Sequence, residues 1–169
     1  MGLLRHHDDN HLQFKMREDL ISIGDDYWIE NNSGDRVYKV NGKAARVRDT
    51  WILEDREGHR VAEIREKVVT VRDKITIEIG DEEATVKKAL VGIRDRFHIE
   101  VKHGKDLKAH GNIVDHEYEI ERDGDKIAEV SKKWFRVRDT YGIEIYDPSA
   151  TVMLLAITVA VDALSHDRG

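Results

Sequence analysis

The sequence has no cysteine and a single proline in 169 residues. Without cysteine the protein has no disulfide, no thiol nucleophile and no thiolate zinc site, which fits a reducing compartment such as the cytoplasm. One proline and 12 glycines are too few for flexible linkers or low-complexity arms. We therefore expect one folded domain rather than a string of modules.

Long apolar stretches are scarce as well. The longest covers residues 150–164, which makes 15 residues, whereas a helix that spans a bilayer needs about 20. Residues 1–10 are polar and lack the apolar region of a secretory signal. We therefore expect no transmembrane span and a cytoplasmic protein, at most peripheral to a membrane.

Charge of one sign does not dominate the sequence. Charged residues make up 37%, with 28 basic and 34 acidic side chains and a net charge of -6. This balance disfavours a generally basic nucleic-acid-binding protein, so we expect no nucleic-acid partner. The hydrophobic content of 40% is sufficient for an ordinary core.

Recognisable catalytic motifs are absent from the sequence. It contains no nucleophile elbow, phosphate-binding glycine loop, zinc-protease helix or dinucleotide fingerprint. The nine histidines show no spacing typical of metal ligands. We therefore predict no enzymatic activity, no cofactor and no resident metal.

An internal repeat is the strongest feature of the chain. Its motif reads apolar–x–Asp–x–large apolar–x–apolar–Glu, as in Val47–Glu54 and Val137–Glu144. The Asp position recurs at intervals of 21 to 24 residues, and a histidine replaces it in the fifth copy. The six anchor residues are Asp25, Asp49, Asp73, Asp95, His116 and Asp139.

Each repeat holds two runs of alternating apolar and polar residues, one on either side of its anchor. Alternation with a period of two predicts half-buried β-strands. Turn sequences such as Asn32–Asp35 and Asp123–Asp125 separate the repeats. One repeat is therefore a β-hairpin, and six repeats predict twelve strands.

The stretch 150–164 completes the predicted fold. Closing a twelve-stranded meander removes its two unpaired edges, but the barrel is then too wide for strand side chains alone to fill. This stretch is apolar on all sides, as an enclosed helix is, with Asp147 suited to the N-cap and Pro148 to the first helical position. We predict a mainly β (α+β) fold in which a closed twelve-stranded antiparallel barrel of six hairpins surrounds a central C-terminal helix. The expected organisation is a polar leader at 1–12, the barrel domain at 13–165 and a polar tail at 166–169.

The chain resembles the LURP-one-related family from about Phe14 to Leu164, most specifically in Gly111–Tyr118, Ser131–Phe135 and Asp139–Ile145. The resemblance implies the tubby-like fold, a twelve-stranded barrel around a central helix that is distantly similar to phospholipid scramblases. Tubby proteins bind phosphoinositide headgroups through basic residues on the barrel. The corresponding basic residues cannot be placed on this sequence, so none is carried over, and the resemblance assigns no activity.

Arginine precedes the anchor in four of the six repeats. In a meander all turns within hairpins lie at one end of the barrel, so these side chains form a rim that can clamp phosphate groups. Two lysines beside an aromatic pair, Trp134 and Phe135, add a cluster that suits a membrane interface. The candidate anion- or lipid-binding residues are Arg48, Arg72, Arg94, Arg138, Lys132 and Lys133.

Alternatives to this binding site stay open. The charges of the rim sum to zero because acidic residues adjoin the arginines, so the rim is alternatively a solvated structural feature. Trp134 and Phe135 are alternatively core residues of their strand. The primary hypothesis is a non-enzymatic barrel that binds an anionic membrane surface or a phosphorylated ligand, and the alternative is a protein-interaction scaffold. An unrecognised hydrolase and a membrane-anchored scramblase-like protein are further hypotheses.

Overall fold

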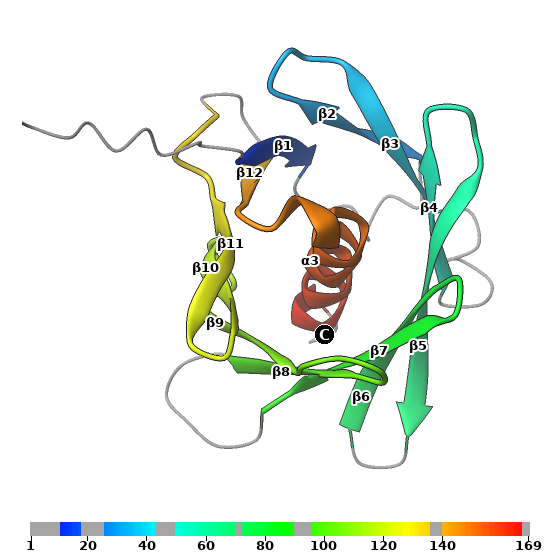
Figure 1. The fold of residues 1–169 in the computed structure, drawn as a ribbon, viewed down its shortest axis with the longest axis vertical. Coiled ribbons are helices and arrows are strands. Elements are labelled where there is room, and N and C mark those ends of the chain that lie inside the picture. Colours follow the sequence, from blue (N-terminus) through cyan, green and yellow to red (C-terminus); the bar gives the residue numbers. More distant parts are fainter. Residues whose placement is uncertain are drawn as a thin grey trace, which may run out of the picture.

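The structure is a computed structural model that describes residues 11–17, 26–42, 50–69, 72–89, 96–135 and 140–166, with the backbone alone at 68, 69, 72, 73 and 166. In this part of the chain, twelve strands form a closed antiparallel barrel around one α-helix (Figure 1). The strands are β1 (Leu12–Arg17), β2 (Tyr27–Asn31), β3 (Arg36–Asn41), β4 (Thr50–Asp55), β5 (Arg60–Val69), β6 (Arg72–Ile79), β7 (Glu82–Lys88), β8 (Arg96–Val101), β9 (Leu107–Asn112), β10 (Glu117–Arg122), β11 (Asp125–Ser131) and β12 (Thr140–Ile145). Each strand pairs with its neighbours in the chain, and β1 also pairs with β12, so the sheet has no free edge.

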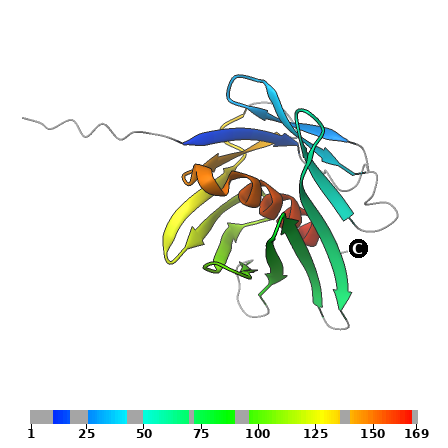
Figure 2. The same cartoon turned by 45° about the vertical axis from the view of Figure 1, so that its right-hand side comes forward.

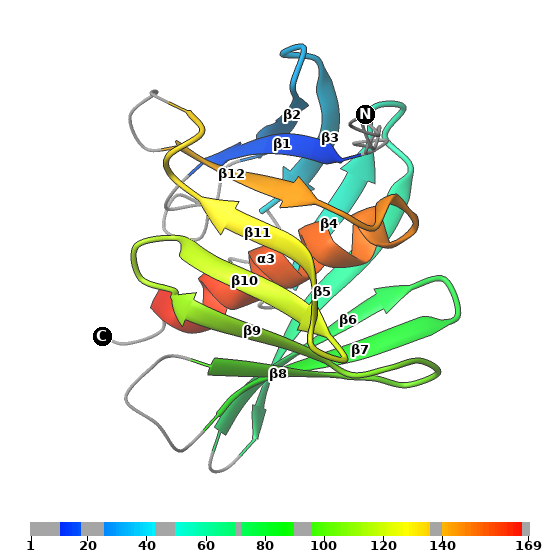
Figure 3. The same cartoon turned by 60° about the vertical axis from the view of Figure 1, so that its left-hand side comes forward.

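The six predicted hairpins are therefore confirmed, and they give the barrel two different ends (Figure 3). At the loop end, where β1, β3, β5, β7, β9 and β11 finish, the two strands of each hairpin are connected. At the turn end, tight turns join one hairpin to the next. The turn Asn31–Asp35 shows their chemistry, because the Asn31 Oδ1 accepts the backbone N–H groups of Ser33 and Asp35 at 2.9 Å. Gly34 completes this turn at φ 81°, a conformation that favours glycine.

Alternation along the strands builds the core. Ile75 pairs with Val86 and Val86 with Ile99, and all three side chains are fully buried inside the barrel. The residues between them face outward, and many of them form ion pairs across neighbouring strands. Examples are Lys15 with Glu30 at 2.5 Å and Lys39 with Glu54 at 2.9 Å. The repeated Glu of the motif therefore lies on the outer wall of the barrel.

The C-terminal helix fills the barrel, as predicted (Figure 2). A short 3-10 turn, η1 (Pro148–Ala150), follows Asp147 and leads into α3 (Thr151–His166), which packs against β5, β6, β7 and β12. By length and hydropathy Pro148–Ser165 could cross a membrane, but 72% of this stretch is buried inside the barrel. Leu154 to Val161 are completely inaccessible, so the helix serves as the core of the barrel.

One acid, Asp162, interrupts the apolar sequence of α3, and its carboxylate is buried among aromatic residues near the loop end. The Tyr141 hydroxyl donates a hydrogen bond to its Oδ2, and the Nδ1 of His116 lies 3.4 Å from its Oδ1. Burial raises the pKa values of Tyr27, Tyr118 and Tyr141 well above the usual range, and the nearby Asp162 carboxylate raises them further. The cluster connects the helix to β2, β10 and β12.

Candidate functional site

Basic side chains from five neighbouring strands meet on the outer wall of the barrel, toward the loop end. They face outward because they alternate with core residues such as Ile75 and Val86. The register pairs Lys67 with Lys74, Lys74 with Lys87, Lys87 with His98 and His98 with Lys108. We refer to Lys67, Lys74, Lys87, His98 and Lys108 as the basic row.

The basic row differs from other parts of the wall, where the lysines of β1 and β3 are opposite or near glutamates. Side chains that are directly opposite each other in an antiparallel pair have Cβ atoms roughly 5 Å apart, and like charges at this separation destabilise the sheet. Lys74 has a lysine as its direct partner on both sides, Lys67 on β5 and Lys87 on β7. The register therefore concentrates positive charge at this place.

Local compensation of this charge is incomplete. Lys87 donates to the Glu100 carboxylate at 2.9 Å, and the Nε2 of His98 lies 3.3 Å from the Asp106 carboxylate. Lys67 and Lys74 form no ion pair with any residue whose side chain the structure describes. The Lys87 and His98 side chains are 36% and 41% exposed, and Lys67 and Lys108 are exposed too, so the row is open to a ligand.

An acidic row crosses the same strands nearer the turn end. Glu63 pairs with Glu78, and Glu78 pairs with Glu83. These glutamates lie four residues from Lys67, Lys74 and Lys87 on the same strands, or about 13 Å at the rise of a β-strand. Glu63 is itself paired with Arg60 and Arg65, so the uncompensated charge on this face is that of the basic row toward the loop end.

The residues predicted from the sequence are only partly visible. Arg48, Arg94 and Arg138 lie outside the described residues, and Arg72 is described only as backbone in β6, paired with Val69. Arg72 is nevertheless two residues from Lys74 in the same strand, so its backbone adjoins the basic row.

Lys132 and Lys133 follow β11 at the loop end, two strands away from the Lys108 end of the basic row. Their backbone is held in place, because the Glu117 carboxylate accepts hydrogen bonds from the Ser131 hydroxyl and the Lys132 N–H. The Lys133 N–H in turn donates to the Ser131 Oγ at 3.1 Å. The structure therefore presents these two lysines at the same end of the barrel as the basic row, as a separate feature.

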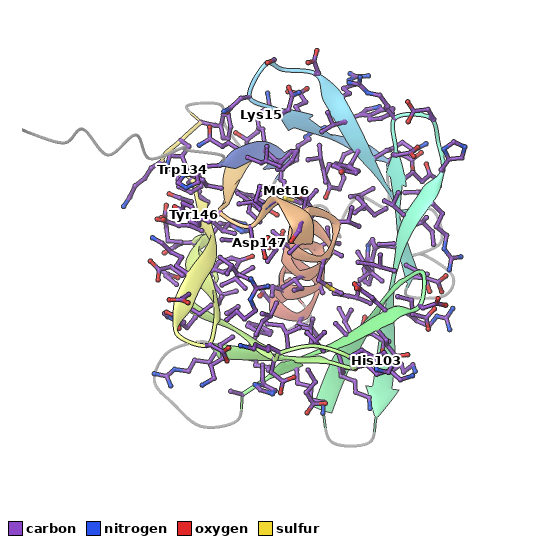
Figure 4. The ribbon with its side chains drawn as sticks, viewed as in Figure 1. Lys15, Met16, His103, Trp134, Tyr146 and Asp147 are labelled. Carbon is purple, nitrogen blue, oxygen red and sulfur yellow. The ribbon has the colours of Figure 1, made fainter. Side chains whose placement is uncertain are left out.

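The aromatic pair beside these lysines packs against β12. Trp134 and Phe135 follow the end of β11, and Trp134 lies at the outside of the barrel (Figure 4). A Cβ atom on Gly142 would lie 2.6 Å from Phe135 Cε2 and 2.9 Å from Trp134 Cε3, so the two rings cover this glycine. The interpretation of the pair as core residues of a strand is wrong, because both side chains are half-buried, follow the end of β11 and are not part of the buried core.

Within the described residues, two groups of side chains have the mutual distances of a metal site, and members of both have other partners. In the first, Asp55, Glu57 and His59 lie in an exposed turn, where the Asp55 carboxylate accepts the N–H groups of the other two. In the second, formed by His110, Glu119 and Glu121, the His110 Nε2 lies 2.8 Å from Glu121 and Lys126 donates to Glu119. Neither group has a feature that points to a bound ion.

The candidates predicted from the sequence did not include Lys67, Lys74, Lys87, His98 and Lys108, because they were restricted to the arginine before each anchor and to the lysines beside Trp134. The signal was present, since Lys67 and Lys74 are equidistant from the middle of their hairpin. Extending that symmetry to the next turn would have placed Lys87 opposite Lys74.

Comparison with known proteins supports the fold. The family model described as LURP-one-related matches residues 12–162. The X-ray structure of an Arabidopsis thaliana protein is similar with a TM-score of 0.55 at 14% sequence identity, covering 90% of this chain and 91% of that one. No curated protein matched the sequence.

Proposed function

The chain belongs to the LURP-one-related family, and on this premise we propose that its barrel is a non-enzymatic module that binds phosphate groups at an anionic surface. A phospholipid headgroup and a free phosphorylated ligand share this chemistry. The observation that carries the proposal is the basic row, in which Lys74 lies between two other lysines. A bound phosphate would remove the repulsion that the register creates.

The burial of the side chains best suited to acid–base catalysis supports the non-enzymatic part of the proposal. His116, Tyr141 and Asp162 resemble an acid–base constellation, but their side chains are in the core, with 4%, 0% and 3% exposure. A substrate on the outer wall would not reach them. Their hydrogen bond and ring contacts hold the helix in the barrel instead.

The predicted arginines extend the proposed surface. Arg72 belongs to β6 with Lys74, and Arg94 belongs to the connection between β7 and β8, which carry Lys87 and His98. We assign these two arginines to the same phosphate-binding surface as the basic row. Lys132 and Lys133 add positive charge at the loop end, and Arg48 and Arg138, which lie outside the described residues, stay predicted members of the phosphate-binding surface.

Vesicle sedimentation tests the proposal at about 0.1 M salt, where surface charges are partly screened. We expect the protein to sediment with vesicles that contain phosphatidylserine or a phosphoinositide and to stay in solution with pure phosphatidylcholine. Each lysine near an anionic surface contributes about 1 kcal/mol, so the Lys67→Gln/Lys74→Gln variant should bind about 30-fold more weakly. Higher salt should weaken binding of the wild type further.

The matched control is Lys15→Gln/Lys39→Gln, which removes the same charge from lysines that are already paired with Glu30 and Glu54. This variant should bind vesicles like the wild type. Equal weakening of both double variants would contradict the proposed location, and equal sedimentation with neutral vesicles would contradict the proposed ligand.

Soluble inositol phosphates distinguish the two sources of phosphate. Competition at micromolar concentration would indicate a free phosphorylated ligand, and its failure alongside vesicle binding would indicate a membrane. If neither ligand binds, the protein-interaction scaffold becomes the better hypothesis, and the basic row would then suit an acidic protein partner.

A further inference from the structure

A large cavity opens at the turn end of the barrel, beside the start of the central helix. Its volume is about 1170 Å³, and it is lined mainly by β1, β3, η1, the first turn of α3, the turns that follow β2 and β8, and the adjoining ends of β6 and β7. Asp147, which precedes η1, lies beside the helix in Figure 4, and the lining residue His103 lies on the opposite wall. We call this space the mouth cavity.

The inner walls of the mouth cavity are apolar. Half-buried side chains from β1, β3, β6 and β8 and from the helix face the cavity, and they also pack against the core. These residues are Leu12, Val37, Tyr38, Ile79, Val101 and Val152. The cavity therefore exposes a continuation of the hydrophobic core that the helix does not cover at this end.

The rim of the mouth cavity offers no unpaired lysine or arginine side chain. Its two cationic side chains are already paired, Arg122 with Asp147 at 2.7 Å and Lys105 with Asp123. Two glutamates, Glu82 and Glu83, line the cavity as well. Polar groups of Gln13, Asn32 and Ser33 also line the cavity, together with His11 and His103, whereas the Asn31 amide is already bonded within its own turn.

From this combination we infer that the mouth cavity binds an electrically neutral single-chain lipid, such as a monoacylglycerol or a long-chain alcohol. The hydrocarbon chain lies along the apolar walls, and the hydroxyl groups of the head reach the rim. An anionic head is disfavoured because both cations are paired and two glutamates are close. The volume slightly exceeds the 300–1,000 Å³ of typical small-molecule sites, which suits a long chain better than a compact metabolite.

This inference does not depend on the phosphate-binding proposal. The mouth cavity lies at the turn end, whereas the basic row lies on the outer wall toward the loop end. The two sites differ in charge and in polarity, so the loss of one ligand should leave the other unaffected. Lys67→Gln/Lys74→Gln should therefore bind neutral lipid like the wild type.

Displacement of a neutral naphthylamine fluorophore tests the inference. We expect monoolein, used below its aggregation concentration, to displace the fluorophore at a concentration at least tenfold lower than oleate requires. Val101→Trp should fill the cavity and reduce fluorophore affinity at least tenfold. Val61→Trp is the matched control, because Val61 is also a half-buried residue packed on the core but does not line the cavity.

Wild-type protein provides a second measurement that needs no folded variant. A monoacylglycerol with a photoreactive diazirine in its chain should label peptides that contain Val101–Lys105 or Thr151–Met153. Labelling confined to other peptides, equal displacement by oleate, or equal loss of affinity in both tryptophan variants would overturn the inference.

Discussion

The imidazole of His116 stacks on the ring of Tyr141, with the centroids 4.3 Å apart and the planes 6° from parallel. His116 stands where the other repeats have Asp, and its backbone adopts a left-handed φ of 51°. Its Nδ1 faces Asp162 from the β9–β10 turn, while Tyr141 donates to the same carboxylate from β12. The histidine that makes the fifth repeat irregular therefore lies beside the one acidic residue of the helix.

Replacement of His116 should weaken the fold. His116→Ala removes the stacked ring and the neighbour of a buried carboxylate, and loss of one member of a buried pair costs about 3 kcal/mol. Chemical denaturation should show this decrease in the free energy of unfolding. Asp123→Ala is the control for the backbone, because Asp123 also has a positive φ, at 53°, but lies in an exposed turn. Equal losses in both variants would assign the effect to backbone conformation alone.

A charge in the middle of the helix should abolish cooperative folding. The Ile157 side chain is fully buried, and an unpaired carboxylate there costs about 5 kcal/mol or more, close to the whole stability of many domains. Ile157→Asp should therefore lose the cooperative melting transition in calorimetry. Val114→Asp introduces the same group at a site that is 71% exposed and should melt like the wild type. A near-native transition for Ile157→Asp would contradict the enclosed helix.

The tyrosines should resist ionisation until the protein unfolds. Burial raises the pKa of all five, to about 12 for Tyr146 and well above the usual value for Tyr27, Tyr118 and Tyr141, while Tyr38 is raised by burial and by Asp55. A raised pKa favours the neutral form, so the associated stability is complete below about pH 10 and is lost as the pH rises through the folded values. Absorbance at 295 nm should show little tyrosinate at pH 10.5 in native protein, whereas guanidinium-unfolded protein should be largely ionised. Normal titration of three or more tyrosines in the native protein would be inconsistent with the buried cluster.

Acid should weaken the start of the helix. A hydrogen bond from the Ser149 hydroxyl and one from the Arg122 guanidinium lower the pKa of Asp147. Because the folded pKa is lowered, this contribution is present above about pH 3.9 and disappears as the pH falls through the folded value. Asp147→Asn should lose about 1 kcal/mol at pH 6, a figure that allows for solvent screening of the half-exposed Arg122.

The difference in melting temperature between Asp147→Asn and the wild type should shrink below pH 4 and vanish near pH 2. Asp125→Asn, at the exposed first residue of β11, controls for the change in net charge. A difference that stays constant from pH 6 to pH 2 would show that ionised Asp147 does not stabilise the fold.

The fold could be predicted from the sequence because its determinants are local and periodic. Alternation identifies each strand, the anchors count the hairpins, and the apolar circumference of 150–164 identifies a helix that needs enclosure. The pairing of β1 with β12 joins residues about 130 apart, such as Phe14 and Ile143, and only the requirement to remove sheet edges pointed to it.

The basic row was harder to predict because it depends on register. Lys74 and Lys87 are 13 residues apart in sequence and become neighbours only because the turn at Gly80 and Asp81 has two residues. A change of one residue in that turn would place other side chains opposite each other. His116 and Asp162 can each be recognised in the sequence, because His116 replaces the repeated Asp and Asp162 interrupts an apolar stretch. Their contact could not be predicted, because no periodicity connects a turn to a helix residue 46 positions later.

The order of elements along the chain has a consequence for how the protein is made. The helix that fills the barrel follows all twelve strands, and β12, which closes the sheet onto β1, immediately precedes it. The twelve strands therefore leave the ribosome exit tunnel before the helix does, and their apolar inner side chains stay exposed until the helix follows. The barrel cannot be filled until this helix is translated, and the apolar side chains exposed until then make the nascent chain prone to aggregation.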